Sequence, residues 1–303
     1  MTTDVAATNA VPLPREEQAS VAVTRVKRNR RRIRWGANIV AIVFAIVWIF
    51  PVYWMLNTAF KPRDEVMSAT PRFWPGHIDV GNFVSALAQP AFLQDLRNSL
   101  LCVFGTLIIA ILLGMFASAA LTRFRYRGRK VILVVILAVQ MLPSTALLIP
   151  QFLVFNRIGL TGTYIGLILA YVASVLPFSI WVMRGFFLAI PVELEEAAAI
   201  DGAGPWRILF SVLFPLVTPG IIASSIFAFI AAWNDYLTAY VFMSDSSMYT
   251  LPLWLQSFTT PNGGTDYGAQ MAASVVFSLP VVVFFLIIQR NLVSGMSAGA
   301  VKG

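Results

Sequence analysis

Long apolar runs separated by short polar stretches dominate the chain from residue 38 onward. A helix needs roughly 20 apolar residues to cross a hydrocarbon core about 30 Å thick, and each run reaches that length. Lipid offers no hydrogen-bond partner to an open backbone, so we predict that every run is a helix. The predicted spans cover residues 38–59, 98–121, 131–155, 163–187, 212–242 and 270–289.

Small residues recur at four-residue spacing within these runs, as at Gly114 and Ser118. Small side chains let two helix backbones approach closely in lipid. We therefore expect close helix packing there, although the pattern says nothing about a substrate.

The composition indicates the same fold class, an all-α integral membrane protein. Hydrophobic residues make up 58% of the 303 residues and charged residues 12%, about half the charged fraction of a soluble domain. We expect one six-helix membrane domain over residues 35–303, preceded by a disordered cytoplasmic basic tail over residues 1–34. The first apolar run is too long for a signal peptide, so we do not expect cleavage.

The basic residues set the expected orientation. Most of them lie in two blocks beside apolar runs, at residues 25–34 and 122–130, which is typical of topology signals rather than of nucleic-acid binding. With the N-terminus inside, the inner segments from residue 25 carry sixteen Lys and Arg and the outer segments five. We therefore predict that both termini are cytoplasmic. Two long outer loops follow, at 60–97 and 243–269, and composition fits spacers and docking surfaces equally well.

The residue inventory argues against catalysis by this chain. Cys102 is the only cysteine and His77 the only histidine, so neither an internal disulfide nor a Cys/His metal site can form. We expect Cys102 to act as a small buried hydrophobe. No G-x-x-x-x-G-K-[ST] stretch is present to hold nucleotide phosphates. We predict that the chain is not an enzyme and has no catalytic residue, bound metal or cofactor of its own.

An acidic stretch, EEAAAIDGAGPWRILFSVLFPL at residues 195–216, stands out on the predicted inner side. Pro191 suits the first turn of a helix, and the acids that follow it suit the positive helix N-terminus. Gly202 and Gly204 interrupt the pattern, and Pro205 can begin a second helix. We expect a short projecting helix, a glycine elbow and a second helix that packs on the bundle. The predicted apolar stripe of that second helix consists of Trp206, Leu209, Phe210 and Leu213. On pattern alone, an ordinary solvated loop is the alternative.

The same stretch resembles the EAA loop of permease subunits of bacterial ABC importers. The family pattern is E-A-A, three residues, G, nine residues and I-x-L-P, and Val and Phe replace the Ile and Leu here. The matching positions are Glu196, Ala197, Ala198, Gly202, Val212, Phe214 and Pro215. The chain end LVSGMSAGAVKG and the stretch AAWNDYLTA (231–239) are similar to the carbohydrate importers of that group. The resemblance extends over most of the chain and implies a type I permease fold.

The resemblance implies a transmembrane permease subunit of an ATP-driven carbohydrate importer in the bacterial cell membrane. Such a subunit forms half of the pore, and its EAA loop, within residues 191–210, docks on a cytoplasmic ATPase. It implies a sister permease, two ATPase subunits that hold ATP and Mg, an extracytoplasmic binding lipoprotein and membrane lipid as partners, and no nucleic acid. The implied coupling residues are Glu193, Glu195, Glu196, Ala197, Ala198, Asp201 and Gly202. The implied C-terminal ATPase contacts are Ser297 and Lys302.

Polar groups within the spans are candidates for the translocation path, because such groups are costly in lipid and often face a cavity. Trp233 offers a flat face to a sugar, or is an interfacial anchor. Asp235 lines the path or is a structural partner of a neighbouring helix or of an Arg. The predicted path set is Gln140, Trp233, Asn234 and Asp235, and the further polar candidates within the spans are Asn156, Ser224 and Ser225. Gln140 has an interhelical hydrogen bond as its alternative. The resemblance places the binding-protein contact at Pro261 and Asn262.

Three other readings remain open from the sequence. A permease for glycerol phosphates, polyols or other solutes has the same architecture. A stand-alone secondary transporter or channel is expected to show an inverted repeat or paired intramembrane acids, and Asp235 stands alone. An intramembrane enzyme needs a reactive cluster, which the sequence lacks.

Overall fold

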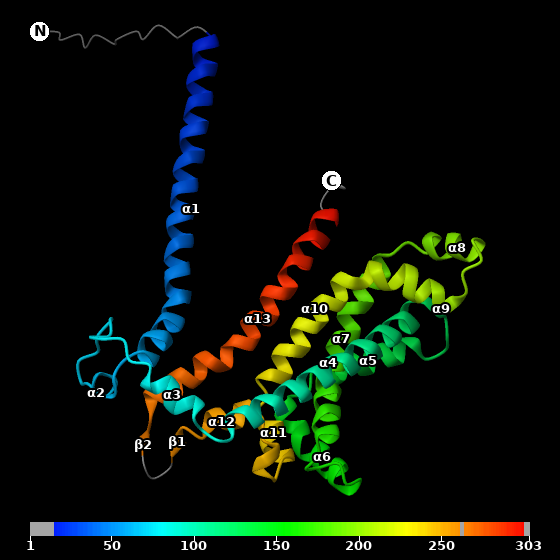
Figure 1. Ribbon diagram of the computed structural model, residues 1–303. Coiled ribbons are helices and arrows are strands. Elements are labelled where there is room, and N and C mark those ends of the chain that lie inside the picture. The colour runs from blue at the N-terminus through cyan, green and yellow to red at the C-terminus, as the bar shows by residue number, and fades with distance from the viewer. Residues whose placement is uncertain (1–14, 261–263, 300–303) are drawn as a thin grey trace, which may run out of the picture. The chain divides into compact units, whose positions relative to one another are not determined.

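The computed structural model describes residues 15–260 and 264–299, with side chains over 35–259 and 264–289. The chain forms two compact units, Met1–Met55 and Leu56–Gly303. Helices account for nearly all regular structure in these described ranges, and the only strands among them are a two-residue pair. Figure 1 traces the elements along the chain.

The first helix, α1 (Arg15–Ala59), contains the first predicted span. Its segment Trp35–Ala59 is long and apolar enough to cross a membrane. We expected a disordered tail through residue 34, whereas the structure is helical from Arg15. Residues 15–34 are rich in Arg, Lys, Glu, Gln and Ala, which favour helix. They also extend an existing helix, so no costly new nucleus is needed. Residues 1–14 of the predicted tail lie outside the described residues.

Two helices of the second unit, α4 (Phe92–Arg123) and α7 (Tyr164–Ala189), run parallel and form its centre. Near their starts the Tyr164 hydroxyl donates to the Asn98 side-chain oxygen at 2.8 Å. Near their ends the Arg123 guanidinium donates to the Ile190 carbonyl at 3.1 Å. We call the Asn98 end the outer end and the Arg123 end the inner end, following the orientation predicted from the basic residues.

The pair α4 and α7 packs as closely as the small-residue spacing predicts. A Cβ added at Gly114 would lie 3.4 Å from the Met183 sulfur. One turn later the Ser118 hydroxyl donates to the Ile180 carbonyl of α7 at 3.0 Å. The small residues therefore bring the two backbones together over the inner half of the helices.

The third predicted span is broken. Residues 131–155 were expected to form one helix, but α5 (Arg129–Gln140) and α6 (Ser144–Arg157) meet at a bend of 107°. Pro143 lies at the break and disfavours helix in the residue before it. Because α4 and α7 are parallel, α5 and α6 together must return the chain from the inner end to the outer end. The broken pair therefore acts as one crossing.

The fifth predicted span is shorter than expected at its outer end. After α8 (Glu193–Ile200), α9 (Pro205–Arg207) and the π-helical η1 (Ile208–Leu213), α10 (Phe214–Trp233) returns to the outer end. It stops at Trp233 rather than at residue 242, and α11 (Leu237–Phe242) is separate. The Asp235 carboxylate explains the new start, because it accepts hydrogen bonds from the backbone N–H groups of Thr238 and Ala239.

The outer loops are folded segments that pack against the bundle. The first holds α2 (Arg63–Val66) and α3 (Gly81–Leu87). The second holds η2 (Ser246–Met248), α12 (Leu251–Gln256), and the antiparallel strands β1 (Thr259–Thr260) and β2 (Gly264–Thr265). Arg63 and Asp266 join the two loops through an ion pair of 3.0 Å. The last helix, α13 (Tyr267–Gly299), contains the sixth predicted span.

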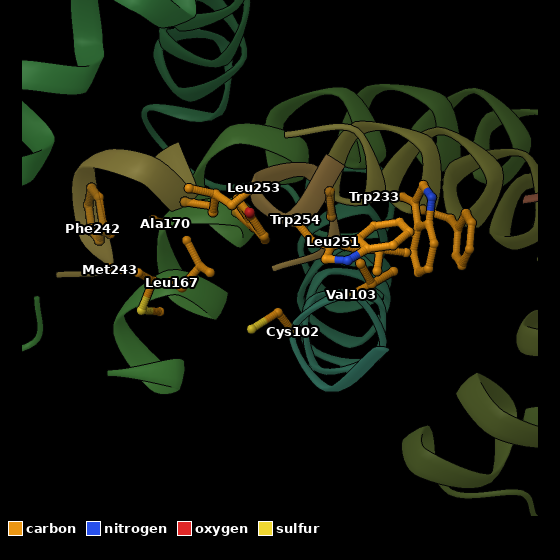
Figure 2. Close-up of a cluster of buried hydrophobic side chains, with 14 of the residues drawn as sticks. Cys102, Val103, Leu167, Ala170, Trp233, Phe242, Met243, Leu251, Leu253 and Trp254 are labelled. Carbon is orange, nitrogen blue, oxygen red and sulfur yellow. The ribbon is translucent and has the colours of Figure 1, made fainter. Parts of the chain in front are cut away.

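The largest buried cluster lies toward the outer end, where α4, α7, α10 and α12 meet. Figure 2 shows Cys102 and Val103 of α4 among the buried side chains of the other elements, including Leu251 and Trp254 of α12. Cys102 is fully buried, as predicted for a small hydrophobe. The core therefore anchors the outer end, and α8 lies away from it (Figure 1).

Candidate functional site

The acidic stretch forms the predicted short helix at the inner end. Glu193, Glu195 and Glu196 occupy the first turn of α8, where carboxylates favour the positive end of the helix dipole. The alanines that follow are strong helix formers. The prediction of a short helix here is therefore confirmed, with α8 beginning two residues after Pro191.

The glycine elbow ends α8 with a double hydrogen bond. Gly202 has φ +81°, the left-handed conformation that glycine adopts without a Cβ penalty. The Ala203 N–H donates to the Ala198 carbonyl at 2.9 Å, and the Gly202 N–H donates to the Ala199 carbonyl at 3.0 Å. This pairing is a Schellman motif, which satisfies the last carbonyls of a helix. It reverses the chain, so that α8 packs back against η1.

One face of α8 is left uncovered by the described residues. Glu193, Glu196, Ala197 and Ile200 lie at helical spacing and are all exposed. Ile200 is the extreme case, with 87% of its surface exposed. This face combines two carboxylates with a small and a large apolar residue.

Glu195 differs from the other acids of this helix. It forms an ion pair with Arg123 at the end of α4, and both side chains are mostly buried, at 18% and 13% exposed. Glu195 was predicted to contact a partner along with its neighbours, but its carboxylate faces the bundle. The spacing explains the difference, because Glu195 follows Glu193 by two residues and so points away from the Glu193 face.

The segment after the elbow departs from the predicted apolar stripe. Leu213 is buried and Leu209 is half-buried, as expected, but Trp206 and Phe210 are 68% and 46% exposed. These two rings stack on each other with centroids 6.2 Å apart. The π-helical turns of η1 explain the departure, because they carry more residues per turn than the 3.6 period assumes.

A small apolar cluster packs against this segment. It joins α4, α7 and α10, and Leu209 and Ile190 pack against it. Its buried members are Met115, Ala119, Met183, Phe187, Leu213 and Val217. The residues before α8, at Ile190, and after it, at Leu209, therefore pack against the same cluster.

The predicted path residue Trp233 is part of the core. Only 1% of its surface is exposed, and its indole N–H donates to the Phe277 carbonyl of α13 at 3.2 Å. Its ring stacks on Phe229 at 5.6 Å. Within this chain Trp233 fastens α10 to α13 rather than lining an open path. The sequence motif showed an aromatic next to polar residues but could not show which way the ring faces.

The other predicted path residues do not converge. Asn234 is exposed and its amide donates back to the Ile230 carbonyl of α10 at 2.9 Å. Asp235 is half-buried, and its carboxylate caps α11. Gln140 is exposed at the end of α5, an element that packs against α7.

The residues predicted to contact the binding protein and the C-terminal ATPase contacts lie in parts of the chain whose side chains are not described. Pro261 and Asn262 lie outside the described residues, as does Lys302. Ser297 lies in the helical backbone of α13, and its side chain is not among those described. Within the described residues no group of three or more His, Cys, Asp and Glu side chains comes together as metal ligands would.

Arg123 also belongs to this site, although the sequence did not predict it. It belongs to the basic block 122–130, which was interpreted only as a topology signal. Nothing in the local pattern separates Arg123 from Arg125 or Arg127, and only the fold brings it against Glu195.

The family of binding-protein-dependent transport system inner membrane components matches residues 110–298. This range runs from the middle of α4 into α13 and includes the whole of α8. The chain belongs to this family. The permease is thus a multi-pass inner membrane protein, as its apolar helices predict.

Similar proteins cover nearly the full length of the permease. The diacetylchitobiose uptake system permease protein DasC of Streptomyces coelicolor is 37% identical over 266 residues, 88% of this chain and 96% of its own. The trehalose transport system permease protein SugB of Mycobacterium tuberculosis is 33% identical over 279 residues, 90% of this chain and 99% of its own.

A solved structure supports the fold. A chain from a bacterial ABC transporter involved in the import of alginate aligns over 93% of the permease and 99% of its own length, with a TM-score of 0.73 at 21% identity. The predicted all-α type I permease fold is confirmed.

Proposed function

We propose that the permease is the membrane subunit of an ATP-driven carbohydrate importer and that α8 couples it to a cytoplasmic ATPase. The observation that carries the proposal is the exposed face of α8 at the end of a glycine-capped hairpin. Glu193, Glu196, Ala197 and Ile200 form this face. It is slim, acidic and apolar, and suits a basic-rimmed cleft on another subunit.

The supporting elements can carry motion from α8 into the spans. The segment α9 and η1 continues directly into α10. The cluster around Met183 and Leu213 ties α10 to α4 and α7. A displacement imposed on α8 would therefore move three spans together rather than one. A ligand moves such an equilibrium only if it favours one state, and ATP binding to the partner supplies that preference.

The partners follow from the same proposal. The family name specifies a binding protein, and we infer an extracytoplasmic lipoprotein of that kind, a sister permease that completes the pore, and two ATPase subunits that hold ATP and Mg. The packed outer loops offer a surface to the binding protein. The names of the relatives support a carbohydrate as the solute.

The orientation rests on charge and parity. The parallel pair α4 and α7 makes α5 and α6 one crossing, so six crossings bring both termini to the same side. The sixteen-to-five distribution of Lys and Arg favours that side as cytoplasmic. We therefore propose that α8 and both termini face the cytoplasm.

The test reverses one charge on the exposed face. Glu196→Lys should abolish ATP-driven uptake in a strain that depends on this importer, because the lysine repels the basic rim of the partner cleft. The helix should survive, since a misplaced charge in its first turn costs about 0.3–1 kcal/mol. Purification measures both the amount of permease in the membrane and the amount of ATPase retained with it.

Lys130→Glu is the matched control. Lys130 is exposed in the first turn of α5 at the same end of the bundle, and its reversal changes a charge without touching α8. Uptake should persist in this variant. Normal uptake and normal ATPase retention by Glu196→Lys would refute the coupling role of α8.

A further inference from the structure

We propose that Arg123 is a positioning residue that fixes α8 to the ends of α4 and α7, so that α4 follows α8 when the ATPase moves it. The inference rests on the proposed function of α8 and adds a residue outside the EAA pattern. Its basis is the meeting of three elements at one guanidinium.

The contacts of Arg123 join segments that are distant in the sequence. Arg123 is the last residue of α4. Its guanidinium donates to the carbonyl of Ile190, the residue directly after α7, at 3.1 Å. The same guanidinium forms an ion pair with Glu195 in the first turn of α8. A planar guanidinium with several donors can hold a carbonyl and a carboxylate at the same time.

The burial of this pair distinguishes it from an ordinary surface ion pair. The side chains of Arg123 and Glu195 are 13% and 18% exposed. Exposed pairs contribute little because water and salt screen them. Removing one partner from a mostly buried pair leaves the other charge without compensation, so the broken state is strongly disfavoured. We call the contacts of Arg123 with Glu195 and Ile190 the clamp, and we expect them to persist while the complex moves.

The geometry also shows what is lost without the clamp. α8 joins the chain through residues 190–192 on one side and the Gly202 elbow on the other. These connections reach α4 only indirectly, through the apolar cluster that joins it to α10, and not at its end, which lies about 70 positions earlier in the sequence. The ion pair is the polar contact that the structure gives between α8 and α4 among its described side chains. Without it α8 keeps its two connections and its contact with η1 but loses its direct tie to the end of α4, so its distance from α4 can vary.

The neighbouring arginine Arg125 provides a control. It lies two residues beyond Arg123, in the exposed stretch between α4 and α5. Arg125→Gln removes the same charge from the same basic block and leaves the clamp intact. Effects of total charge or of membrane orientation should therefore appear equally in both variants.

The test measures a distance in the complete transporter, reconstituted in lipid vesicles with its ATPase and sister permease. One spin label is placed at Ala199 on α8 and one at Ile108 on α4, both exposed positions. Cys102 is replaced by Ser, and Mg–ATP is the only added ligand. With Arg123 intact, we expect a narrow α8–α4 distance distribution that Mg–ATP leaves unchanged. Arg123→Gln and Glu195→Gln should each lose the narrow distribution and shift on addition of Mg–ATP.

Rescue separates positioning from a general effect on folding. The exchange Arg123→Glu with Glu195→Arg should restore the narrow distribution, whereas either half alone should not. ATPase retention should be normal in Arg123→Gln, because the exposed face of α8 is untouched. An unchanged distribution in Arg123→Gln, or an equal change in Arg125→Gln, would overturn the inference. Absence of the ATPase from the unsubstituted complex would instead refute the proposed function.

Discussion

The inner and outer ends of the helical bundle are built in opposite ways. At the outer end the Asn98 amide donates to the Ser247 and Tyr249 carbonyls at 3.0 and 2.9 Å, while its oxygen accepts from Tyr164. Large side chains such as Trp254 are fully enclosed there. At the inner end, α8 leaves Ile200 exposed and attaches to α4 through an ion pair.

This difference separates folding from coupling along the length of one chain. The outer end holds the larger of the two buried apolar clusters, so close packing and hydrogen bonds there should dominate the stability of the isolated permease. The inner end keeps apolar and charged groups uncovered, so its contacts depend on a partner. Substitutions at the outer end should therefore lower the free energy of unfolding. Substitutions on the exposed inner face should impair assembly or transport with little effect on that free energy.

The largest expected loss of stability is that of a substitution at Trp254, at the outer end. Its ring lies 5.0 Å from Phe92 and 5.1 Å from Phe258 between centroids, and 2% of its surface is exposed. Trp254→Ala should lower the free energy of unfolding by about 3–5 kcal/mol, because it leaves a cavity in the main cluster. Thermal unfolding in detergent measures the change. A loss below about 1 kcal/mol would contradict the role of the outer end as the anchor of the fold.

A smaller effect is expected at Asn98. Asn98→Leu keeps the size of the side chain but leaves the Tyr249 carbonyl and the Tyr164 hydroxyl without their partner. The expected destabilisation is about 1–3 kcal/mol, the cost of a buried polar group without a hydrogen bond. Gln94→Leu is the matched control, because the exposed Gln94 also donates to the Ser247 carbonyl, at 2.6 Å. Equal losses in the two variants would show that burial is not what makes the Asn98 contacts matter.

The next largest effect is expected on the local stability of α8, from a substitution in the glycine elbow at the inner end. Gly202→Ala should destabilise α8 by about 1–2 kcal/mol through its left-handed backbone alone, since an added Cβ meets nothing within 4 Å. Gly204 is the matched control, with φ −70° and equally open space around it. Hydrogen exchange should therefore speed up across α8 in Gly202→Ala and stay unchanged in Gly204→Ala. Unfolding of the whole permease at a lower temperature would contradict a local effect.

The sequence predicts the architecture well because lipid restricts the possible structures. Six long apolar runs, the elbow at Gly202 and the short acidic helix all follow from local rules, and the structure has each of them. The break at Pro143 and the early end of α10 at Trp233 were missed. Polar residues lie at both breaks, but hydropathy averaged over a span-length window stays high across them and gives no signal of a bend.

The candidate site was less predictable, because its contacts join distant segments. Glu195 and Glu196 are adjacent acids with the same local propensity, yet one is paired with Arg123 and the other is exposed. Trp233 lies beside polar residues in the sequence but packs into the core against α13. Which way a side chain faces depends on the neighbouring helix, and this information is not present in a short motif.

The smallest change in stability, and the sharpest test of the comparison, belongs to Ile200. With 87% of its surface exposed, Ile200 contributes little to the fold of the isolated chain. Ile200→Ser should therefore change the free energy of unfolding by no more than about 0.5 kcal/mol. If the exposed face of α8 enters a cleft, the same substitution removes apolar contact area from that interface, and ATPase retention should fall. Ile165 is a matched control, since it is 64% exposed near the outer end of α7. Ile165→Ser should leave ATPase retention unchanged. Loss of stability without loss of the ATPase in Ile200→Ser would mean that the inner end, like the outer, is covered by its own chain.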